Sequence, residues 1–288
     1  VILILAGVVN AQNVYVSASS GQDYNGCGDE SSPCATLYFG GLNCPTNANP
    51  CTLMLQPGYY SGYDNSDINF GTTSVTIENA DPTGEVILDG ESSNLGFKGS
   101  ASLTLNGLTV QNYRHSAFTW VGTQNGCSIT VTNCAFIGNQ ATGNGGAFSV
   151  SDVTSFDINS NVQFINNIAH GTEVSPGSPI FGFGGAVYLG CSKNSQHCSL
   201  QINDKNVQFI NNIAQSVGNG VTANSRGGAV YVHNEYPDVS VNFAENVTFV
   251  GNKAIANVEN SGIGINPVSI SQGGAIYILN EANGARVS

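Results

Sequence analysis

The stretch Asn161-Val-Gln-Phe-Ile-Asn-Asn167 contains the motif that decides the fold, a phenylalanine followed three residues later by an asparagine. Four copies of this Phe-x-x-Asn motif mark the repeat: Phe136–Asn139, Phe164–Asn167, Phe209–Asn212 and Phe249–Asn252. Successive copies lie 28, 45 and 40 residues apart. Self-similarity at intervals of this size is the signature of a repeat architecture.

A second motif, Gly-Gly-Ala, alternates with the first. Its four copies begin at the glycine pairs Gly145-Gly146, Gly184-Gly185, Gly227-Gly228 and Gly273-Gly274. The order of the two motifs never changes. The segments that separate them, residues 168–183, 213–226 and 253–272, are rich in Gly, Ser, Asn and Pro and differ in length. We expect these segments to be loops at one edge of a regular scaffold, where binding usually occurs, although inert covers over the sheet edge would look the same.

The residues around each motif alternate in polarity with a period of two, which indicates β-strands. Val162 and Phe164 fall on one strand face, and Cys134 and Phe136 occupy the same two positions, so Cys134 is expected to point inward. Short strands that repeat without helices between them predict a parallel solenoid, in which each strand bonds to its equivalent about 4.8 Å along the axis. The chain is therefore expected to be an all-β parallel β-helix.

Equivalent side chains of a solenoid lie above one another. We expect the phenylalanines to form an apolar column and the asparagines to form an amide ladder at a corner, with Asn itself in the left-handed conformation. The glycine pairs would supply a positive φ or a close backbone approach. A repeat of about 40 residues is expected to form two turns of about 20 residues, one for each motif.

The paired motifs resemble the repeats of the chlamydial polymorphic outer membrane proteins, over about residues 128–280. The resemblance implies a right-handed parallel β-helix, exposed at a cell surface and used for adhesion or surface architecture. Upstream, residues 31–37 and 53–60 resemble the opening of pectate-lyase-like β-helices, in which a short helix or strand caps the first turn. We therefore expect an N-terminal cap and first coil over residues 12–67, and β-helix repeats over 68–288 that are truncated at the C-terminus.

Residues 1–11 form an apolar run that ends in Val9-x-Ala11 and is too short to span a membrane. It is interpreted as the remnant of a secretory signal peptide, with a buried first strand as the alternative.

Eight cysteines agree with secretion into an oxidising compartment. Three pairs, each seven residues apart, enclose turn-forming residues and are predicted to be disulfides: Cys27–Cys34, Cys44–Cys51 and Cys191–Cys198. The first two would close a disulfide-rich N-terminal cap. Cys127 and Cys134 enclose a strand-like sequence that would hold them apart, so a bridge there is not expected unless the chain turns sharply. Zinc ligands are usually closer in sequence than these pairs.

Composition excludes one class of function. The net charge is −12, and only seven residues are Lys or Arg, so binding to a nucleic-acid backbone is not expected.

The sequence shows no pattern that is typical of catalysis or metal binding. No carboxylates form the clustered pair that glycoside hydrolysis needs. Arg114-His115 is the one cationic pair that could serve a lyase as a base. Five acidic residues are expected to be solvated or to lie in turns: Asp64, Asp67, Asp152, Asp157 and Asp204. The histidines His115, His170, His197 and His233 show no metal-ligand spacing, and residues 23–30 hold oxygen donors without the full calcium-loop pattern. No catalytic, cofactor or metal-binding residue is therefore predicted, and the protein is not expected to be an enzyme.

These observations predict a secreted or cell-surface structural or adhesive β-helix. Its expected partner is an extracellular glycan, a protein or a second copy of itself, with end-to-end filaments as one form of self-association through open strand edges. A polysaccharide lyase or glycoside hydrolase on the same scaffold is the alternative, because fold alone does not decide function. Asn246, in the sequon Asn246-Val-Thr248, is a predicted glycosylation site if the chain passes through a eukaryotic secretory pathway.

Overall fold

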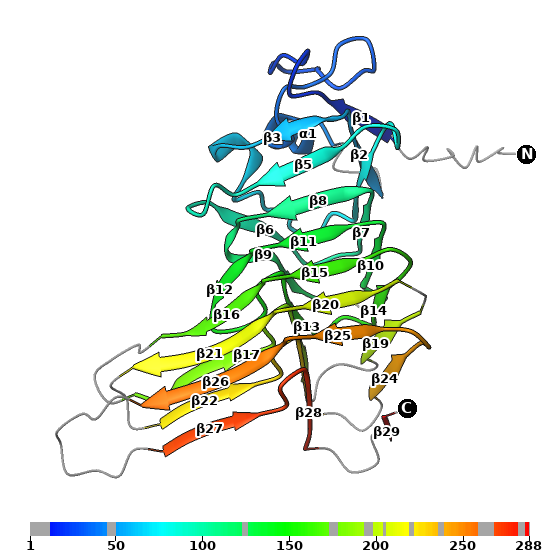
Figure 1. Ribbon diagram of the computed structural model, residues 1–288. Coiled ribbons are helices and arrows are strands. Elements are labelled where there is room, and N and C mark those ends of the chain that lie inside the picture. The colour runs from blue at the N-terminus through cyan, green and yellow to red at the C-terminus, as the bar shows by residue number, and fades with distance from the viewer. Residues whose placement is uncertain are drawn as a thin grey trace, which may run out of the picture.

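The computed structural model describes residues 12–44, 50–122, 126–172, 178–192, 198–203, 206–218, 222–235, 239–258, 268–281 and 286–287. The chain forms a right-handed parallel β-helix that starts at β1 (Gln12–Val16) and winds along a single axis (Figure 1). The predicted fold is thus confirmed. Residues 1–11, which include the expected signal-peptide remnant, and Asp204 and His197 lie outside the described residues.

Three stacked sheets form the walls of the helix. The largest comprises β1, β2 (Cys51–Leu55), β4 (Val75–Asn79), β7 (Leu103–Asn106), β10 (Ser128–Thr132), β14 (Ser155–Ile158), β19 (Cys198–Ile202), β24 (Val239–Phe243) and β29 (Arg286–Val287). The second comprises β3 (Gly58–Tyr60), β5 (Val86–Asp89), β8 (Leu108–Gln111), β11 (Ala135–Ile137), β15 (Gln163–Ile165), β20 (Gln208–Ile210) and β25 (Thr248–Val250). The third comprises β6 (Leu95–Gly99), β9 (Arg114–Val121), β13 (Phe148–Ser151), β18 (Val187–Cys191), β23 (Val230–Asn234) and β28 (Ile276–Asn280).

Each repeat is one coil, so the prediction of two turns per repeat was wrong. Phe136 pairs directly with Phe164, Phe164 with Phe209, and Phe209 with Phe249. Both motifs therefore lie in the same turn. The residues between the two motifs do not form a second turn. They project laterally from the coil and then return to it.

That sideways excursion forms a lateral wing of two further sheets (Figure 1). One contains β12 (Gln140–Thr142), β16 (Ile168–Gly171), β21 (Ile213–Gly218) and β26 (Lys253–Val258), and the other β17 (Ile180–Phe183), β22 (Thr222–Arg226) and β27 (Val268–Gln272). Loops were expected here, yet the described parts are strands. Small buried side chains such as Ala169, Ala214 and Ser225 allow the two sheets to pack closely. Residues 173–177, 219–221 and 259–267 of these segments lie outside the described residues.

The core contains the predicted phenylalanine column. The rings of Phe136 and Phe164 are stacked at 5.1 Å between centroids, those of Phe164 and Phe209 at 4.7 Å, and those of Phe209 and Phe249 at 4.8 Å. Cys134 is buried at the position that Val162 and Val207 occupy in the next coils, as expected. The column continues the hydrophobic core from one coil to the next.

The corner after each phenylalanine strand contains the predicted amide ladder. Asn139, Asn167 and Asn212 are completely buried, and each donates a side-chain hydrogen bond to the next asparagine. The left-handed conformation belongs to the residue before each of them, and not to the ladder residue as expected. Gly138, Asn166, Asn211 and Gly251 have φ between 54° and 65°, which explains why this motif position holds only Gly or Asn.

The two glycines of each Gly-Gly-Ala motif have different structural roles. The first has a positive φ, as in Gly184 at +62°. The second allows a close approach between coils, because a Cβ on Gly185 would lie 2.1 Å from the carbonyl oxygen of Gly228. Both conditions favour glycine over larger residues at these positions of the later coils.

The N-terminal end is closed by α1 (Leu37–Leu42), whose first turn is capped by the Thr36 side chain. The disulfides Cys27–Cys34 and Cys44–Cys51 lie in this cap, and Cys191–Cys198 joins β18 to β19. These are the three predicted pairings. Cys127 and Cys134 are free and buried at either end of β10, which holds them apart. Disulfides of this number indicate an oxidising environment.

Candidate functional site

The pair His115-Ser116 occupies a position where the later coils have two glycines. Phe118 of β9 pairs with Phe148 of β13, so His115, Ser116 and Ala117 stand in the place of Gly145, Gly146 and Ala147. His115 has φ +66° and Ser116 has φ +69°. This backbone costs about 1–2 kcal/mol for a residue with a Cβ. Strain of this kind is concentrated at functional sites, so His115 is a candidate functional residue.

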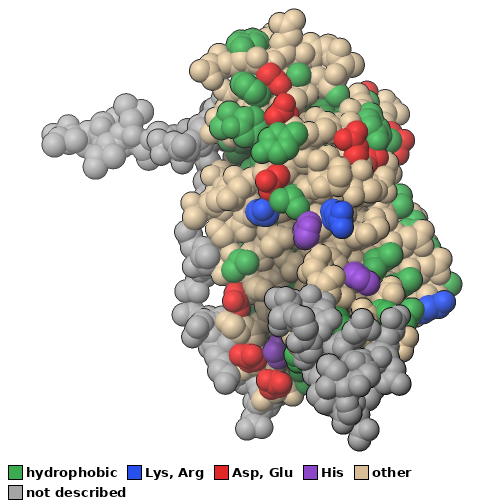
Figure 2. All heavy atoms as spheres, turned by 90° about the vertical axis from the view of Figure 1, so that its left-hand side faces the viewer, with side chains coloured by type: hydrophobic (Ala, Val, Ile, Leu, Met, Phe, Trp, Pro, Cys, Tyr) green, Lys and Arg blue, Asp and Glu red, His purple; other side chains and the backbone are tan. Residues whose placement is uncertain are grey.

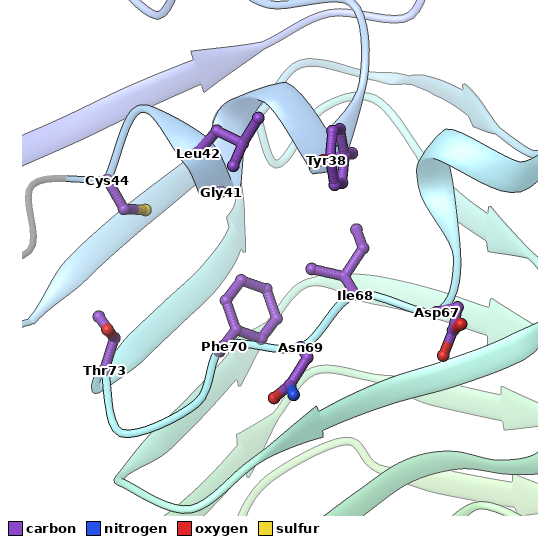
Figure 3. Close-up of a pocket in the computed structure, with 9 residues that line it drawn as sticks. All are labelled: Tyr38, Gly41, Leu42, Cys44, Asp67, Ile68, Asn69, Phe70 and Thr73. Carbon is purple, nitrogen blue, oxygen red and sulfur yellow. The ribbon is translucent and has the colours of Figure 1, made fainter.

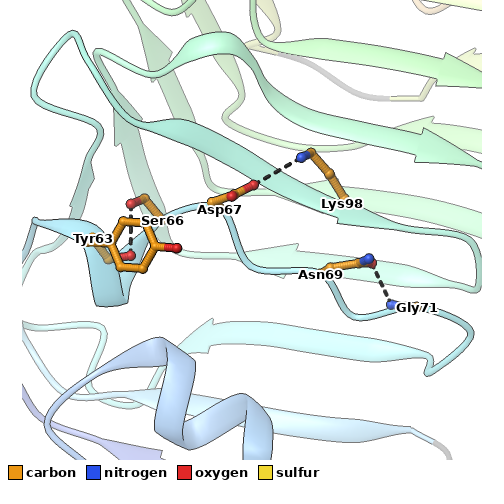
Figure 4. A network of polar contacts seen from close by, with 6 residues as sticks. All are labelled: Tyr63, Ser66, Asp67, Asn69, Gly71 and Lys98. Carbon is orange, nitrogen blue, oxygen red and sulfur yellow. Dashed lines mark hydrogen bonds and ion pairs between the residues drawn. The ribbon is translucent and has the colours of Figure 1, made fainter.

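Next to His115 lies an ion pair that the sequence did not predict. Lys98 Nζ on β6 lies 3.0 Å from Asp67 Oδ1, in the segment that follows η1 (Tyr63–Asn65) (Figure 4). Asp67 was expected to be merely solvated. Its segment is fixed on both sides, because the Ser66 hydroxyl donates to the carbonyl oxygen of Tyr63 and the backbone N–H of Gly71 donates to Asn69 Oδ1. The ion pair therefore has a defined place on the surface.

A cavity of about 420 Å³ lies on one side of this ion pair, between α1 and residues 67–73 (Figure 3). Its apolar lining comes mainly from Leu42, Ile68 and Phe70, while Asp67 and Asn69 contribute polar groups. The ring of Tyr38, which is 46% exposed, stands at its edge. An apolar floor with a few polar groups is the usual composition of a small-molecule site.

A second hollow of about 360 Å³ lies on the other side, lined by Leu95, Gly96, Lys98, His115 and Thr119. We call the two hollows together with the ion pair between them the N-terminal groove. Figure 2 shows basic and histidine side chains gathered near the middle of the corresponding face, with hydrophobic and acidic side chains above them. Arg114, which is exposed, precedes His115 in the chain. In a protein with seven Lys and Arg residues and a net charge of −12, this is a local concentration of positive charge.

A buried carboxylate that lines neither hollow has a structural role that the sequence did not reveal. Asp89, 4% exposed, accepts hydrogen bonds from the side chains of Tyr59, Gln111 and Asn112 and from the backbone N–H of Glu91. Burial of the carboxylate acts to raise its pKa, but these hydrogen bonds outweigh burial and hold the pKa of Asp89 below its ordinary value. The hydrogen bond that Tyr59 donates to Asp89 raises the pKa of Tyr59 to about 12.

Other predicted site residues are dispersed. Asp152 Oδ1 accepts from the backbone N–H of Ser192, and Asp157 accepts from the hydroxyl of Ser155, as expected of turn and strand-end residues. Asn246 is exposed with φ +71°, three residues before Phe249. It stands at the corner where Asn161 and Asn206 form an exposed amide ladder in the preceding coils. The predicted sequon is thus open to modifying enzymes, while its glycosylation stays a prediction.

The described residues contain no helix that is long and apolar enough to cross a membrane. No protein-family model, no curated protein and no solved structure matches this chain. The chemistry of the N-terminal groove is therefore the main guide to function. An ion pair, an imidazole, hydroxyl groups and an exposed ring beside apolar floors can hold a ligand that has both hydroxyl or acidic groups and apolar faces.

Proposed function

We propose that this chain is a secreted or cell-surface β-helix of adhesive or structural function that binds an extracellular glycan in the N-terminal groove. One observation carries the proposal: the Asp67–Lys98 ion pair lies between two hollows, and the strained His115 lines the second hollow together with Lys98. The repeat motifs support it, because they resemble those of surface-exposed polymorphic outer membrane proteins. The three disulfides agree with an extracellular location.

A glycan fits this chemistry better than a protein. Sugar rings present C–H faces that pack on exposed aromatic rings such as Tyr38, and hydroxyl groups that pair with Asp67 and Asn69. Lys98, Arg114 and His115 favour a glycan that carries carboxylate or sulfate groups, because the rest of the chain is acidic.

The test is binding of the purified protein to an array of acidic and neutral glycans. We expect Lys98→Ala and Tyr38→Ala each to weaken binding at least tenfold. Lys253→Ala on the wing and Tyr24→Ala, which remove equally exposed side chains outside the groove, should leave binding unchanged. Equal losses in all four variants would reject the groove as the binding site. Self-association, the other expected partner class, would appear as a particle mass above that of one chain.

Polysaccharide cleavage is a second candidate, and the approach of Lys98 to His115 in one hollow favours it. A lyase needs a base beside an acidic sugar, and an imidazole or amine can serve. Glycoside hydrolysis is less well supported, because Asp67 is the one carboxylate that lines either hollow among the described residues, and it is paired with Lys98. Incubation with polyuronates would separate binding from cleavage, since a lyase leaves an unsaturated sugar with a new ultraviolet absorbance.

A further inference from the structure

Far from the N-terminal groove, two glutamates lie side by side on consecutive coils. Asn234 pairs with Asn280, and the backbone N–H of Glu281 donates to the carbonyl oxygen of Asn234, so Glu235 and Glu281 follow equivalent strand ends. Coils are about 4.8 Å apart, a spacing at which two like charges repel. Nothing in the repeat motifs requires acids here.

An imidazole completes the group. His233 Nε2 lies 3.9 Å from Glu235 Oε1 and 3.7 Å from Glu281 Oε2. This nitrogen is buried and has no hydrogen-bond partner among the described residues, although the side chain as a whole is 27% exposed. One donor atom from each of the three residues falls within 4.8 Å of the other two.

We propose that His233, Glu235 and Glu281 form a binding site for a divalent transition-metal ion, with Zn²⁺ as the best fit. Zinc binds imidazole nitrogen and carboxylate oxygen at about 2.0–2.2 Å, which places neighbouring ligand atoms of a tetrahedral site about 3.4 Å apart. The distances from His233 Nε2 to the two carboxylate oxygens, 3.9 and 3.7 Å, exceed that value by a few tenths of an ångström, and the two carboxylate oxygens lie within 4.8 Å of each other. Water would take the fourth position. The mixed nitrogen and oxygen donors favour zinc over Ca²⁺ or Mg²⁺, which prefer oxygen.

The ion would connect two coils. His233 and Glu235 belong to one coil and Glu281 to the next. Binding would replace the repulsion between the carboxylates with a shared cation, so the metal would act as a staple across the β23–β28 strand pair. The site is independent of the proposed glycan function.

The first test is calorimetric titration of metal-free protein with ZnCl₂. We expect one ion per chain. His233→Gln and Glu281→Gln should each lower the zinc affinity at least tenfold, because mutation of a residue that merely hydrogen-bonds to a metal ligand already lowers metal affinity by about that factor. Glu78→Gln on β4, which removes a carboxylate elsewhere, is the control. Absence of stoichiometric binding, or equal loss in Glu78→Gln, would overturn the proposal.

The second test is a crossover in thermal stability. In EDTA, Glu281→Gln should unfold at the same temperature as the wild type or higher, because one of two neighbouring charges is gone. With Zn²⁺ the order should reverse. A Co²⁺-loaded sample should show a tetrahedral spectrum without thiolate charge-transfer bands. Such bands would instead place the ion on Cys127 or Cys134 and reject the site.

Discussion

The buried amide of Asn139 donates from Nδ2 to Oδ1 of Asn167 in the next coil, at a distance of 3.1 Å. The backbone N–H of Asn139 donates to the same oxygen, also at 3.1 Å. Asn167 in turn donates to the carbonyl oxygen of Phe136 at 2.9 Å. One side chain therefore satisfies backbone groups at a corner where the sheet hydrogen bonds are interrupted. This is why the motif requires asparagine.

Asn167→Ala is expected to destabilise the protein by about 3 kcal/mol or more, because several buried polar groups lose their partner at once. Equilibrium unfolding in urea measures this. Asn161→Gly is the matched control: it removes an amide from the exposed ladder and leaves a residue that tolerates φ +57°. The control should change the free energy of unfolding by less than about 0.5 kcal/mol. Equal effects would show that the buried ladder has no special role.

Gly185→Ala should destabilise the protein by about 3 kcal/mol or more, since the new methyl group would meet the backbone of the next coil. Gly58→Ala serves as the comparison, because a Cβ there meets nothing closer than 3.7 Å. Thermal unfolding of the two variants side by side distinguishes a close coil contact from a general effect of adding a methyl group. Similar stabilities of the two variants would contradict a close contact between coils at Gly185.

His115→Gly is expected to stabilise the fold by about 1 kcal/mol, because glycine tolerates the positive φ without strain. The same change should weaken glycan binding, as the imidazole leaves the groove. A gain in stability with a loss of binding would indicate that strain at His115 is kept for function. A variant that loses stability would refute the strain argument, whatever its binding.

Stability should fall in acid as Asp89 is protonated. Its pKa is lower in the folded protein than in the unfolded chain, so its contribution is present above the unfolded value, near 4, and is lost as the pH falls through the folded one. Tyr59→Phe removes one of the hydrogen bonds that lower this pKa. We expect the Asp89 pKa of that variant to rise, as measured by carboxyl NMR titration. An unchanged value would remove Tyr59 from the network.

The thiols of Cys127 and Cys134 should resist alkylation in the native protein at neutral pH. Burial raises the pKa of Cys127 to about 11 and that of Cys134 to about 12, which leaves little reactive thiolate. Mass spectrometry should find no label on the folded protein and two labels after unfolding without reductant. Rapid native labelling would contradict the buried positions of both residues.

Much of the fold could be predicted from local patterns. Val162 and Phe164 alternate with polar neighbours, and the recurrence of this pattern requires equivalent strands to stack in register. The disulfides Cys27–Cys34, Cys44–Cys51 and Cys191–Cys198 could be predicted because the turn residues between each pair bring its ends together. The wing could not, because its buried residues, such as Ala169 and Ser216, are too small to give a hydrophobic pattern.

The sequence by itself determined the stacked coils, the phenylalanine column, the amide ladder and the disulfides, because each depends on residues that are near in sequence or recur at the same place in a repeat. Only the tertiary structure decided the two candidate sites. Asp67, Lys98 and His115 meet because three successive passes of the chain lie side by side, and His233 meets Glu281 across a coil boundary. These residues are far apart in the sequence and match no sequence motif. They come into contact only because the winding of the β-helix places neighbouring coils side by side.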